Sequence, residues 1–328
     1  MSALKRLIEF SARHVLKRPN LAKRIAFYMP DWVTALRTLL NEVFYQLKLT
    51  RGYAVTAVVV ELSSVCNLDC IICARHKVMT REQGHMDLVL FKRLVDANTS
   101  VRNYILVGWG EMMLNPIFFD AVDYLKSKGK RVALTSNATL FTPDNCERIV
   151  MSGISHITIS MDGIDKVYQS IRGFPFETIE ANITTLSETI RRHGADVYVE
   201  INSVALPAVL SQKDDITRRI GPFVDDIRYS SYLEYNKLKK NNRKNPCREL
   251  WRGMITVLYD GRVVPCCMDY NATMDLGHIS ESSLDELWNN ELAISMRSEQ
   301  LQRKFLRRCA TCFEVNPCKN AEIDKRFD

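Results

Sequence analysis

Three cysteines, Cys66, Cys70 and Cys73, stand within eight residues of the chain. Three thiolates at this C-x3-C-x2-C spacing can hold three irons of a [4Fe–4S] cube and leave the fourth iron open, whereas an electron carrier normally supplies four ligands. A zinc site or a structural cluster is the alternative, but zinc sites favour C-x2-C pairs matched by a second pair downstream. The spacing therefore predicts an iron–sulfur cluster with one open iron.

A second group of cysteines lies between residues 247 and 318, and a hairpin is predicted within it. Asp260-Gly261 fits a type I′ turn between strands at 256–258 and 263–264. That hairpin can bring Cys247 and Cys266 to the same end, which predicts a second metal site, with zinc as the alternative. In a reducing cytosol, ten cysteines indicate metal or redox chemistry more than disulfides. Cys146 stands alone on the apolar side of a predicted helix and is expected to be a buried, inert thiol.

Alternating strand and helix patterns must position these cysteines. The helical pattern at 116–128 is ended by Gly129, and strand follows strand at intervals of about 25–40 residues, the length of a βα unit. Six such units predict a parallel sheet curled into part of a barrel, in which chemistry sits at the carboxyl ends of the strands. The predicted strands are 54–62, 104–107, 131–135, 156–160, 197–204 and 226–230.

Glycines and polar residues follow three of these strands in order, at the edge where the first cysteines lie. Each is an ordinary turn residue when taken alone, but together they predict a binding site. Glycine lets a backbone approach a ligand closely, and a carboxylate suits an ammonium group. The residues are Gly108, Gly110 and Glu111 after the second strand, Asn137 after the third, and Ser160, Asp162 and Arg172 after the fourth.

These motifs resemble those of the radical S-adenosylmethionine (SAM) superfamily, whose signature is C-x3-C-x-hydrophobic-C after the first strand of a half-barrel. The resemblance implies that the segment around Glu111 meets the amino group of SAM, although Met112 replaces the usual proline. It also implies that Ser160 and Arg172 contact the ribose or carboxylate of SAM. The implied reaction uses an electron from the cluster to split SAM, and the 5′-deoxyadenosyl radical then takes a hydrogen atom from a substrate.

The later cysteines are similar to the SPASM/twitch auxiliary-cluster domain of that superfamily, C-x9–15-G-x4-C followed by C-x2-C-x5-C-x3-C. The match ends at Cys318, because Glu322 takes the place of the last cysteine. The resemblance implies one auxiliary [4Fe–4S] cluster, with Cys318 able to replace one of its ligands. Cys267 is expected to point to the opposite strand face as a packed thiol, or to donate a hydrogen atom to a product radical. The implied ligands are Cys247, Cys266, Cys309 and Cys312.

With this resemblance, the chain is expected to divide into a basic helical extension at 1–52, a radical SAM core at 53–235 and a SPASM/twitch domain at 236–328. Residues 1–50 carry nine Lys and Arg against three acids, so almost all of the net charge of +7 lies there. Their apolar helical faces, including Val33, Leu36, Leu40, Val43 and Leu47, are expected to pack on the open side of the half-barrel. The alternative is a peripheral membrane helix attracted to anionic lipid.

Composition also limits the class of protein. No apolar run is long enough to cross a bilayer, and no secretory signal is recognised, so we expect a cytoplasmic protein. If the amino-terminal extension is a peripheral membrane helix, the protein would lie at the inner face of the membrane. Nucleic-acid binding is not expected, because the body of the chain is nearly neutral and shows no platform of aromatic and basic residues.

The motifs together predict an enzyme that oxidises or epimerises a small polar substrate, such as a sugar, an aminocyclitol or a nucleoside. Its reductant would be a flavodoxin or a ferredoxin. Peptide or protein modification is one alternative, although the peptide-recognition domain of about 90 residues is not expected in the 50 or so residues before the barrel. A lipid-linked substrate is another alternative, and a non-enzymatic electron-transfer protein is the alternative from a different class.

Overall fold

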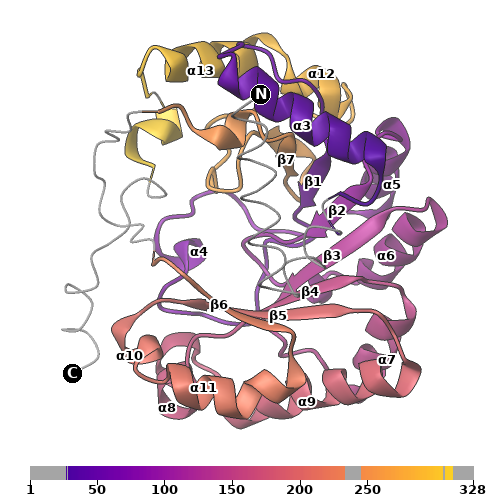
Figure 1. Cartoon of the computed structure of the whole chain (residues 1–328), viewed down its shortest axis with the longest axis vertical. Helices are drawn as coiled ribbons and strands as arrows, with labels where there is room; N and C mark the ends of the chain where they lie inside the picture. The colour runs from indigo at the N-terminus through magenta and orange to yellow at the C-terminus, as the bar shows by residue number, and fades with distance from the viewer. Residues whose placement is uncertain (1–26, 28, 233–244, 306, 313–328) are drawn as a thin grey trace, which may run out of the picture.

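The computed structural model describes residues 27, 29–232, 245–305 and 307–312 (Figure 1). Its first six strands run in sequence order through one sheet, and every neighbouring pair among them is parallel. This confirms the predicted partial (β/α)6 barrel, which is open and not closed into a ring. The strands are β1 (Ala57–Val60), β2 (Asn103–Leu106), β3 (Arg131–Ser136), β4 (His156–Ser160), β5 (Tyr198–Val204) and β6 (Asp226–Ser230).

Helices connect these strands, and most of them lie outside the curved sheet (Figure 1). The predicted helix at 116–128 is α6, and Gly129 follows it with φ +64°, a conformation that favours glycine. The described residues also include the 3-10 turns η1 (Met112–Leu114), η2 (Gly221–Phe223), η3 (Arg248–Leu250) and η4 (Arg307–Thr311). The helices of the barrel are α4 (Ala74–Lys77), α5 (Leu88–Ala97), α6 (Phe118–Ser127), α7 (Pro143–Met151), α8 (Asp165–Arg172), α9 (Phe176–His193), α10 (Pro207–Leu210) and α11 (Lys213–Ile220).

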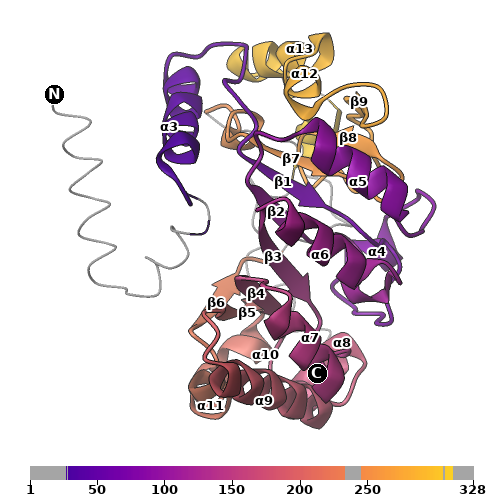
Figure 2. The same ribbon diagram turned by 90° about the vertical axis from the view of Figure 1, so that its right-hand side faces the viewer.

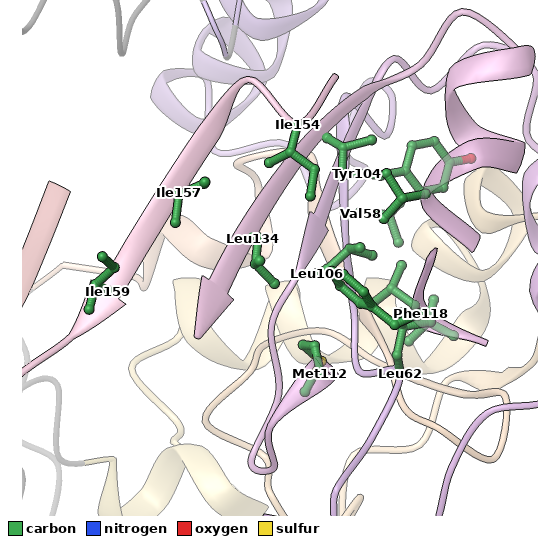
Figure 3. Packing of buried hydrophobic residues seen from close by; sticks show 14 of the residues in the cluster. Val58, Leu62, Tyr104, Leu106, Met112, Phe118, Leu134, Ile154, Ile157 and Ile159 are labelled. Carbon is green, nitrogen blue, oxygen red and sulfur yellow. The ribbon is translucent and has the colours of Figure 1, made fainter. Parts of the chain in front are cut away.

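Side chains alternate between the two faces of the sheet, so the main hydrophobic core lies on the outer face and a separate set of side chains lies on the inner face. On the outer face, Val58, Tyr104, Leu106 and Leu134 pack with the helices, as Figure 3 shows together with Phe118 of α6. The inner face of β1 to β3 carries a smaller apolar cluster. Its members are Phe27, Ala57, Val59, Ile105 and Ala133.

Phe27 anchors the end of the amino-terminal extension on this inner face. Its ring meets His156 edge-on at 5.5 Å, and the Arg131 guanidinium lies 5.4 Å from the ring centre. The extension therefore contacts the inner face of the sheet at this residue. The helical patterns predicted at residues 1–26 lie outside the described residues.

Helix α3 (Trp32–Gln46) has Asp31 as its N-cap, and the Asp31 side chain accepts a hydrogen bond of 2.7 Å from the Thr34 backbone N–H. It packs on the protein through its polar side, where Asn41 is buried. The Asn41 amide donates to the Ala54 carbonyl at 2.8 Å and accepts from the N–H groups of Tyr53 and Ala54.

The expected packing of the apolar face of this helix is wrong. Val33, Leu36, Val43 and Leu47 are exposed and Leu40 is only half-buried, because the bonds of Asn41 fix the rotation of α3.

The carboxyl-terminal residues continue the same sheet, since β7 (Met254–Val257) pairs in parallel with β1. Strands β8 (Arg262–Val264) and β9 (Gly277–His278) follow antiparallel, and α12 (Leu284–Trp288) and α13 (Glu291–Leu301) lie beyond them. The predicted hairpin forms, but its turn is not type I′. Only Gly261, at φ +86°, has a positive φ there, whereas type I′ needs two such residues.

Two further predictions concern the domain boundary and membrane-spanning helices. The boundary predicted at 235/236 falls within residues 233–244, which lie outside the described residues. Among the helices that are described, none is long and apolar enough to cross a membrane.

We expect Asn41→Ala to lower the free energy of unfolding by about 2–4 kcal/mol, because it leaves the buried backbone groups of Ala54 and the Tyr53 N–H without their partner. Urea unfolding followed by circular dichroism measures this. Gln46→Ala, at an exposed position of the same helix, is the control and should change stability by less than about 0.5 kcal/mol. Equal effects of the two variants would contradict the anchoring role of Asn41.

Candidate active site

The loop after β1 carries Cys66, Cys70 and Cys73, and all three thiols are free and half-buried. Its course is fixed by backbone bonds: the Cys73 N–H donates to the Cys70 carbonyl at 3.0 Å, and the Ile71 N–H to the Ile171 carbonyl at 2.9 Å. Helix α4 then begins with Cys73 as its cap. The three sulfurs therefore stand on a short loop at the carboxyl edge of the sheet, as predicted.

Burial raises the pKa of each of these three thiols, that of Cys70 to about 11. Their mutual charges raise the pKa of Cys66 and Cys70 further, whereas Arg172 lowers that of Cys70 and Cys73. Three clustered thiolates are favoured by a cationic group, and the irons of a cluster held by these cysteines would supply that charge.

No three His, Cys, Asp or Glu side chains in the described part of the chain converge as ligands of a single metal ion. A cube in which each thiolate binds a different iron does not require such convergence, so the donor set fits the predicted cluster.

The loop after β2 is pressed against the protein itself at both of its glycines. A Cβ on Gly110 would lie 2.3 Å from the Val65 carbonyl oxygen, and a Cβ on Gly108 would lie 2.3 Å from Cγ of Glu61. The Glu111 N–H also donates to the Val65 carbonyl at 2.8 Å. The groups that require glycine at these two positions are the backbone of residues 63–65 and the Glu61 side chain, whereas the predicted approach to a ligand stays a prediction.

The Glu111 carboxylate joins the loops after β2 and β3. It is buried and accepts hydrogen bonds from the Asn137 N–H at 2.7 Å and from the Ser136 hydroxyl at 2.9 Å. Burial raises its pKa, and these bonds oppose the shift. The Asn137 amide in turn donates to Sγ of Cys66 at 3.7 Å and to Oδ1 of Asn67 at 3.0 Å. Two predicted SAM-site residues thus support the cysteine loop directly.

Asp162 and Arg172 form a second support on the other side of that loop. The Arg172 guanidinium donates to Oδ2 of Asp162 at 2.9 and 2.6 Å, and Asp162 also accepts from the Val204 N–H. Arg172 is held close enough to Cys70 to lower its pKa. Ser160 lies on the inner face, opposite Asn202 in the register of β4 and β5. The structure therefore gathers the predicted residues at one edge of the sheet.

Sequence analysis missed a buried ion pair beneath this site. The Arg81 guanidinium meets both carboxylate oxygens of Glu61 at 2.7 Å, and the side chains are only 3% and 1% exposed. Glu61 also accepts from the Trp109 N–H at 3.0 Å. Burial raises the pKa of Glu61, and the Arg81 charge opposes that shift. The only sequence signal for the pair is a charged residue directly after the apolar run of β1.

This ion pair lies at a junction between the loop after β2 and the loop that carries Cys267. Nε of Arg81 donates to the Tyr270 carbonyl at 2.6 Å, and Nε1 of Trp109 donates to the Cys267 carbonyl at 3.2 Å. The rings of Trp109 and Tyr270 meet edge to face at 5.5 Å. Next to them, the Thr80 N–H donates to Oδ1 of Asn271. The two predicted cysteine sites are therefore physically joined.

The second cysteine group also comes together. Cys247 is near enough to raise the pKa of both Cys266 and Cys309, and Cys312 raises that of Cys309, whose pKa reaches about 12 chiefly through burial. Cys318 lies outside the described residues. Five cysteines of this group are described, and they include all four ligands predicted for one auxiliary cluster.

The expected orientation of Cys267 is wrong. Cys266 and Cys267 follow the end of β8 in a turn, where strand alternation does not apply, and their side chains are hydrogen-bonded. Cys267 is exposed and not a packed thiol. Cys146 is fully buried as expected, and burial raises its pKa to about 12.

The inner face of β4 to β6 is polar where the face of β1 to β3 is apolar. Oε1 of Glu200 accepts from the Arg228 guanidinium and from the Thr158 hydroxyl, both at 3.0 Å. One register step further, the Ser230 hydroxyl donates to Oδ1 of Asn202 at 2.5 Å. Sequence analysis singled out none of these residues. They present hydroxyl, amide and charged groups on the face that leads to the cysteine loop.

Comparison with protein families assigns two regions of the chain. Residues 60–209 match the radical SAM superfamily, and residues 234–313 match the family described as an iron-sulfur cluster-binding domain, SPASM.

Curated relatives include the AdoMet-dependent heme synthase of Methanosarcina barkeri, 31% identical over 44% of this chain and 40% of that protein. A second heme synthase, from Nitratidesulfovibrio vulgaris, is matched over 32% of its length, so the chain spans less than half of these two relatives. The S-adenosyl-L-methionine-dependent 2-deoxy-scyllo-inosamine dehydrogenase of Niallia circulans is 23% identical over 73% of this chain and 84% of its own.

Solved structures share the fold. The crystal structure of BtrN in complex with AdoMet and 2-DOIA superposes with a TM-score of 0.57 and 17% identity, covering 82% of this chain and 97% of that one. SuiB from Streptococcus suis bound to S-adenosylmethionine gives a TM-score of 0.58 at 14% identity, covering 90% and 79%. At these identities the likeness concerns the fold alone.

We expect Glu61→Gln to lower the free energy of unfolding by about 3–5 kcal/mol, because it leaves the Arg81 charge buried without its counter-charge. The double variant Glu61→Leu/Arg81→Met should recover most of that loss, since it removes both charges. Anaerobic urea unfolding measures both effects. Arg218→Ala breaks an exposed ion pair with Asp215 as the control and should cost about 1 kcal/mol or less. A double variant no more stable than Glu61→Gln would contradict this account.

Proposed function

Because the chain belongs to the radical SAM superfamily and carries a SPASM auxiliary-cluster domain, we propose that it abstracts a hydrogen atom from a small polar substrate, which it oxidises or epimerises. Its cofactors are SAM, a SAM-binding [4Fe–4S] cluster and an auxiliary cluster. When bound and reduced, the first cluster supplies the electron that splits SAM and generates the hydrogen-abstracting radical.

In this proposal Cys66, Cys70 and Cys73 hold the SAM-binding cluster. Gly108 and Gly110 pack closely on the cysteine loop, and Glu111 and Asn137 are hydrogen-bonded next to it. We propose that these residues form one side of the SAM-binding site. Arg172, held by Asp162, offers a cation beside Cys70 that suits the carboxylate of SAM. Ser160 lies on the inner face next to this wall.

The proposed ligands of the auxiliary cluster are Cys247, Cys266, Cys309 and Cys312, and Cys318 is able to replace one of them. The junction of Trp109 and Tyr270 holds this group against the SAM side. Cys267 is exposed beside Cys266, and we propose it as the hydrogen-atom donor if the reaction is an epimerisation. Exposure suits that role better than burial does, because the thiol must reach a product radical.

The polar inner face of β4 to β6 is the main observation in support of a small polar substrate. Arg228, Glu200 and Thr158 supply donors and acceptors for hydroxyl or amino groups, and buried polar groups discriminate strongly against substrates that lack a partner. The dehydrogenase of 2-deoxy-scyllo-inosamine among the relatives is consistent with an aminocyclitol or a sugar.

Peptide modification is the second candidate. The mycofactocin maturase of Mycobacterium tuberculosis is 29% identical over 34% of this chain, and a SuiB structure bound to its precursor peptide SuiA covers 88% of the chain with a TM-score of 0.56. For partners, we propose a one-electron reductant such as a flavodoxin or a ferredoxin. We also propose a peripheral membrane contact through residues 1–50 of a cytoplasmic protein.

Reconstituted protein should release 5′-deoxyadenosine from SAM when reduced with dithionite under anaerobic conditions. Cys70→Ala should abolish this release, whereas Cys146→Ala, which removes a buried thiol outside both cysteine groups, should not. Liquid chromatography with mass spectrometry measures the product. An electron-transfer protein would release none, so absence of 5′-deoxyadenosine from the unaltered protein would refute the proposed function.

Iron analysis of the same proteins tests the cluster assignment. We expect about eight irons per chain for two [4Fe–4S] clusters, and about four in either Cys70→Ala or Cys309→Ala. Cys146→Ala should retain about eight. About twelve irons would contradict the proposed number of clusters, and an unchanged iron content in Cys309→Ala would indicate that Cys318 replaces it as a ligand.

Deuterated sugars, aminocyclitols, nucleosides and peptides separate the two candidate functions, because the true substrate transfers deuterium to 5′-deoxyadenosine. With that substrate, Arg228→Met should lower kcat/KM by roughly tenfold or more, through loss of a charged hydrogen bond. SAM cleavage without substrate should stay unchanged. Arg218→Ala on α11 is the matched control. Transfer from a peptide alone would favour the maturase function.

A further inference from the structure

The outward face of α3 is an apolar stripe. In the described part of the chain, nine of the thirteen exposed large hydrophobic residues fall between Met29 and Tyr53. Trp32 is 76% exposed at one end of the helix and Leu47 is 65% exposed at the other. Soluble proteins rarely expose a continuous apolar patch without a binding role. The stripe consists of Trp32, Val33, Leu36, Leu39, Val43 and Leu47.

The orientation of the stripe is fixed by polar contacts on the opposite side of the helix. Thr34 and Asn41 are buried there, and the Asn41 amide is hydrogen-bonded to the backbone of Tyr53 and Ala54. The Tyr45 hydroxyl donates to the Pro246 carbonyl at 3.2 Å. Rotation of α3 to bury the stripe would break all of these bonds. Figure 2 shows α3 at the edge of the molecule, with no other described element on its outer side.

Charge around the stripe identifies the kind of surface that it fits. Both acids near the helix are engaged by arginines: Asp31 lies 3.9 Å from Arg102, and Glu42 pairs with Arg248. Lys48 is exposed just after the helix. In sequence, the 26 residues before Phe27 contain seven Lys and Arg and one acid, a charge of +6. An apolar stripe on a helix that a basic segment precedes in the sequence is typical of a helix that lies in the plane of an anionic membrane.

We propose that α3 is a membrane-docking helix, which lies in the interface of an anionic lipid bilayer with its stripe at the boundary of the acyl chains. The inference deepens the peripheral contact of the proposed function, on which it rests, and does not depend on SAM chemistry. A second copy of the chain fits the stripe less well, because a symmetric dimer through α3 brings two segments of charge +6 together.

Full-length protein mixed with vesicles provides the test, with phosphatidylcholine alone or with added phosphatidylglycerol. We expect co-sedimentation with the anionic vesicles only, weakened as salt rises. Trp32 is a built-in reporter, because Trp251 and Trp288 are 1% exposed and Trp109 packs on Tyr270. Its emission should shift to the blue on binding. Trp32→Phe should lose most of that shift and still sediment with the vesicles.

The double variant Leu36→Glu/Val43→Glu should reduce partitioning to anionic vesicles at least tenfold, since it places two charges in the stripe. Val89→Glu, at a 79% exposed position of α5, is the control and should bind as the unaltered protein does. Both positions of the double variant are exposed, so circular dichroism should show the native fold.

Three results would overturn the inference: equal binding by the double variant, equal binding to both kinds of vesicle, or no binding with a dimer that the double variant dissociates. Release of 5′-deoxyadenosine in vesicle-free solution reports separately on the proposed chemistry. Loss of membrane binding with intact SAM cleavage would therefore refute the docking helix alone.

Discussion

The buried ion pair of Glu61 and Arg81 is the constraint on which the arrangement of the site depends. Arg81 comes eight residues after Cys73, Glu61 ends the apolar run of β1, and their contacts reach Trp109 after β2 and Tyr270 after β8. A pair removed from water gains little net stability, since desolvation offsets its attraction. We infer that it mainly selects one arrangement of these loops, because any other would leave a charge buried alone.

Much of the scaffold follows from patterns that are local in the sequence. The six predicted strands all form, as β1 to β6, and Gly129 follows the end of its helix as expected. The predicted cysteines and polar residues also come together, because a parallel sheet brings the ends of its strands to one edge whatever the loops do. Position along a strand, and not any single motif, made the site predictable.

What could not be predicted depends on contacts between distant residues. Glu61 and Arg81 are twenty residues apart in sequence and neither belongs to a motif. The outward rotation of α3 depends on one buried amide, Asn41, whereas the usual expectation turns an apolar stripe inward. Gly108 and Gly110 matched a ligand-binding segment, yet their first requirement is contact with the cysteine loop. In each case the local sequence pattern indicated the type of residue, but it could not predict which distant residue that side chain contacts.

The parallel pairing of β1 with β7 gives the two cysteine groups a common frame. β1 leads into the loop of Cys66 to Cys73, and β7 begins a few residues after Cys247 and belongs to the hairpin that leads to Cys266. Adjacent strands of one sheet hold a spacing of about 4.8 Å and cannot slide without losing their ladder of hydrogen bonds. The distance between the two proposed clusters is therefore set by backbone pairing and only refined by the side chains of the junction. Electron transfer or substrate anchoring by the auxiliary cluster needs such a fixed separation, and a flexibly linked domain would not provide it.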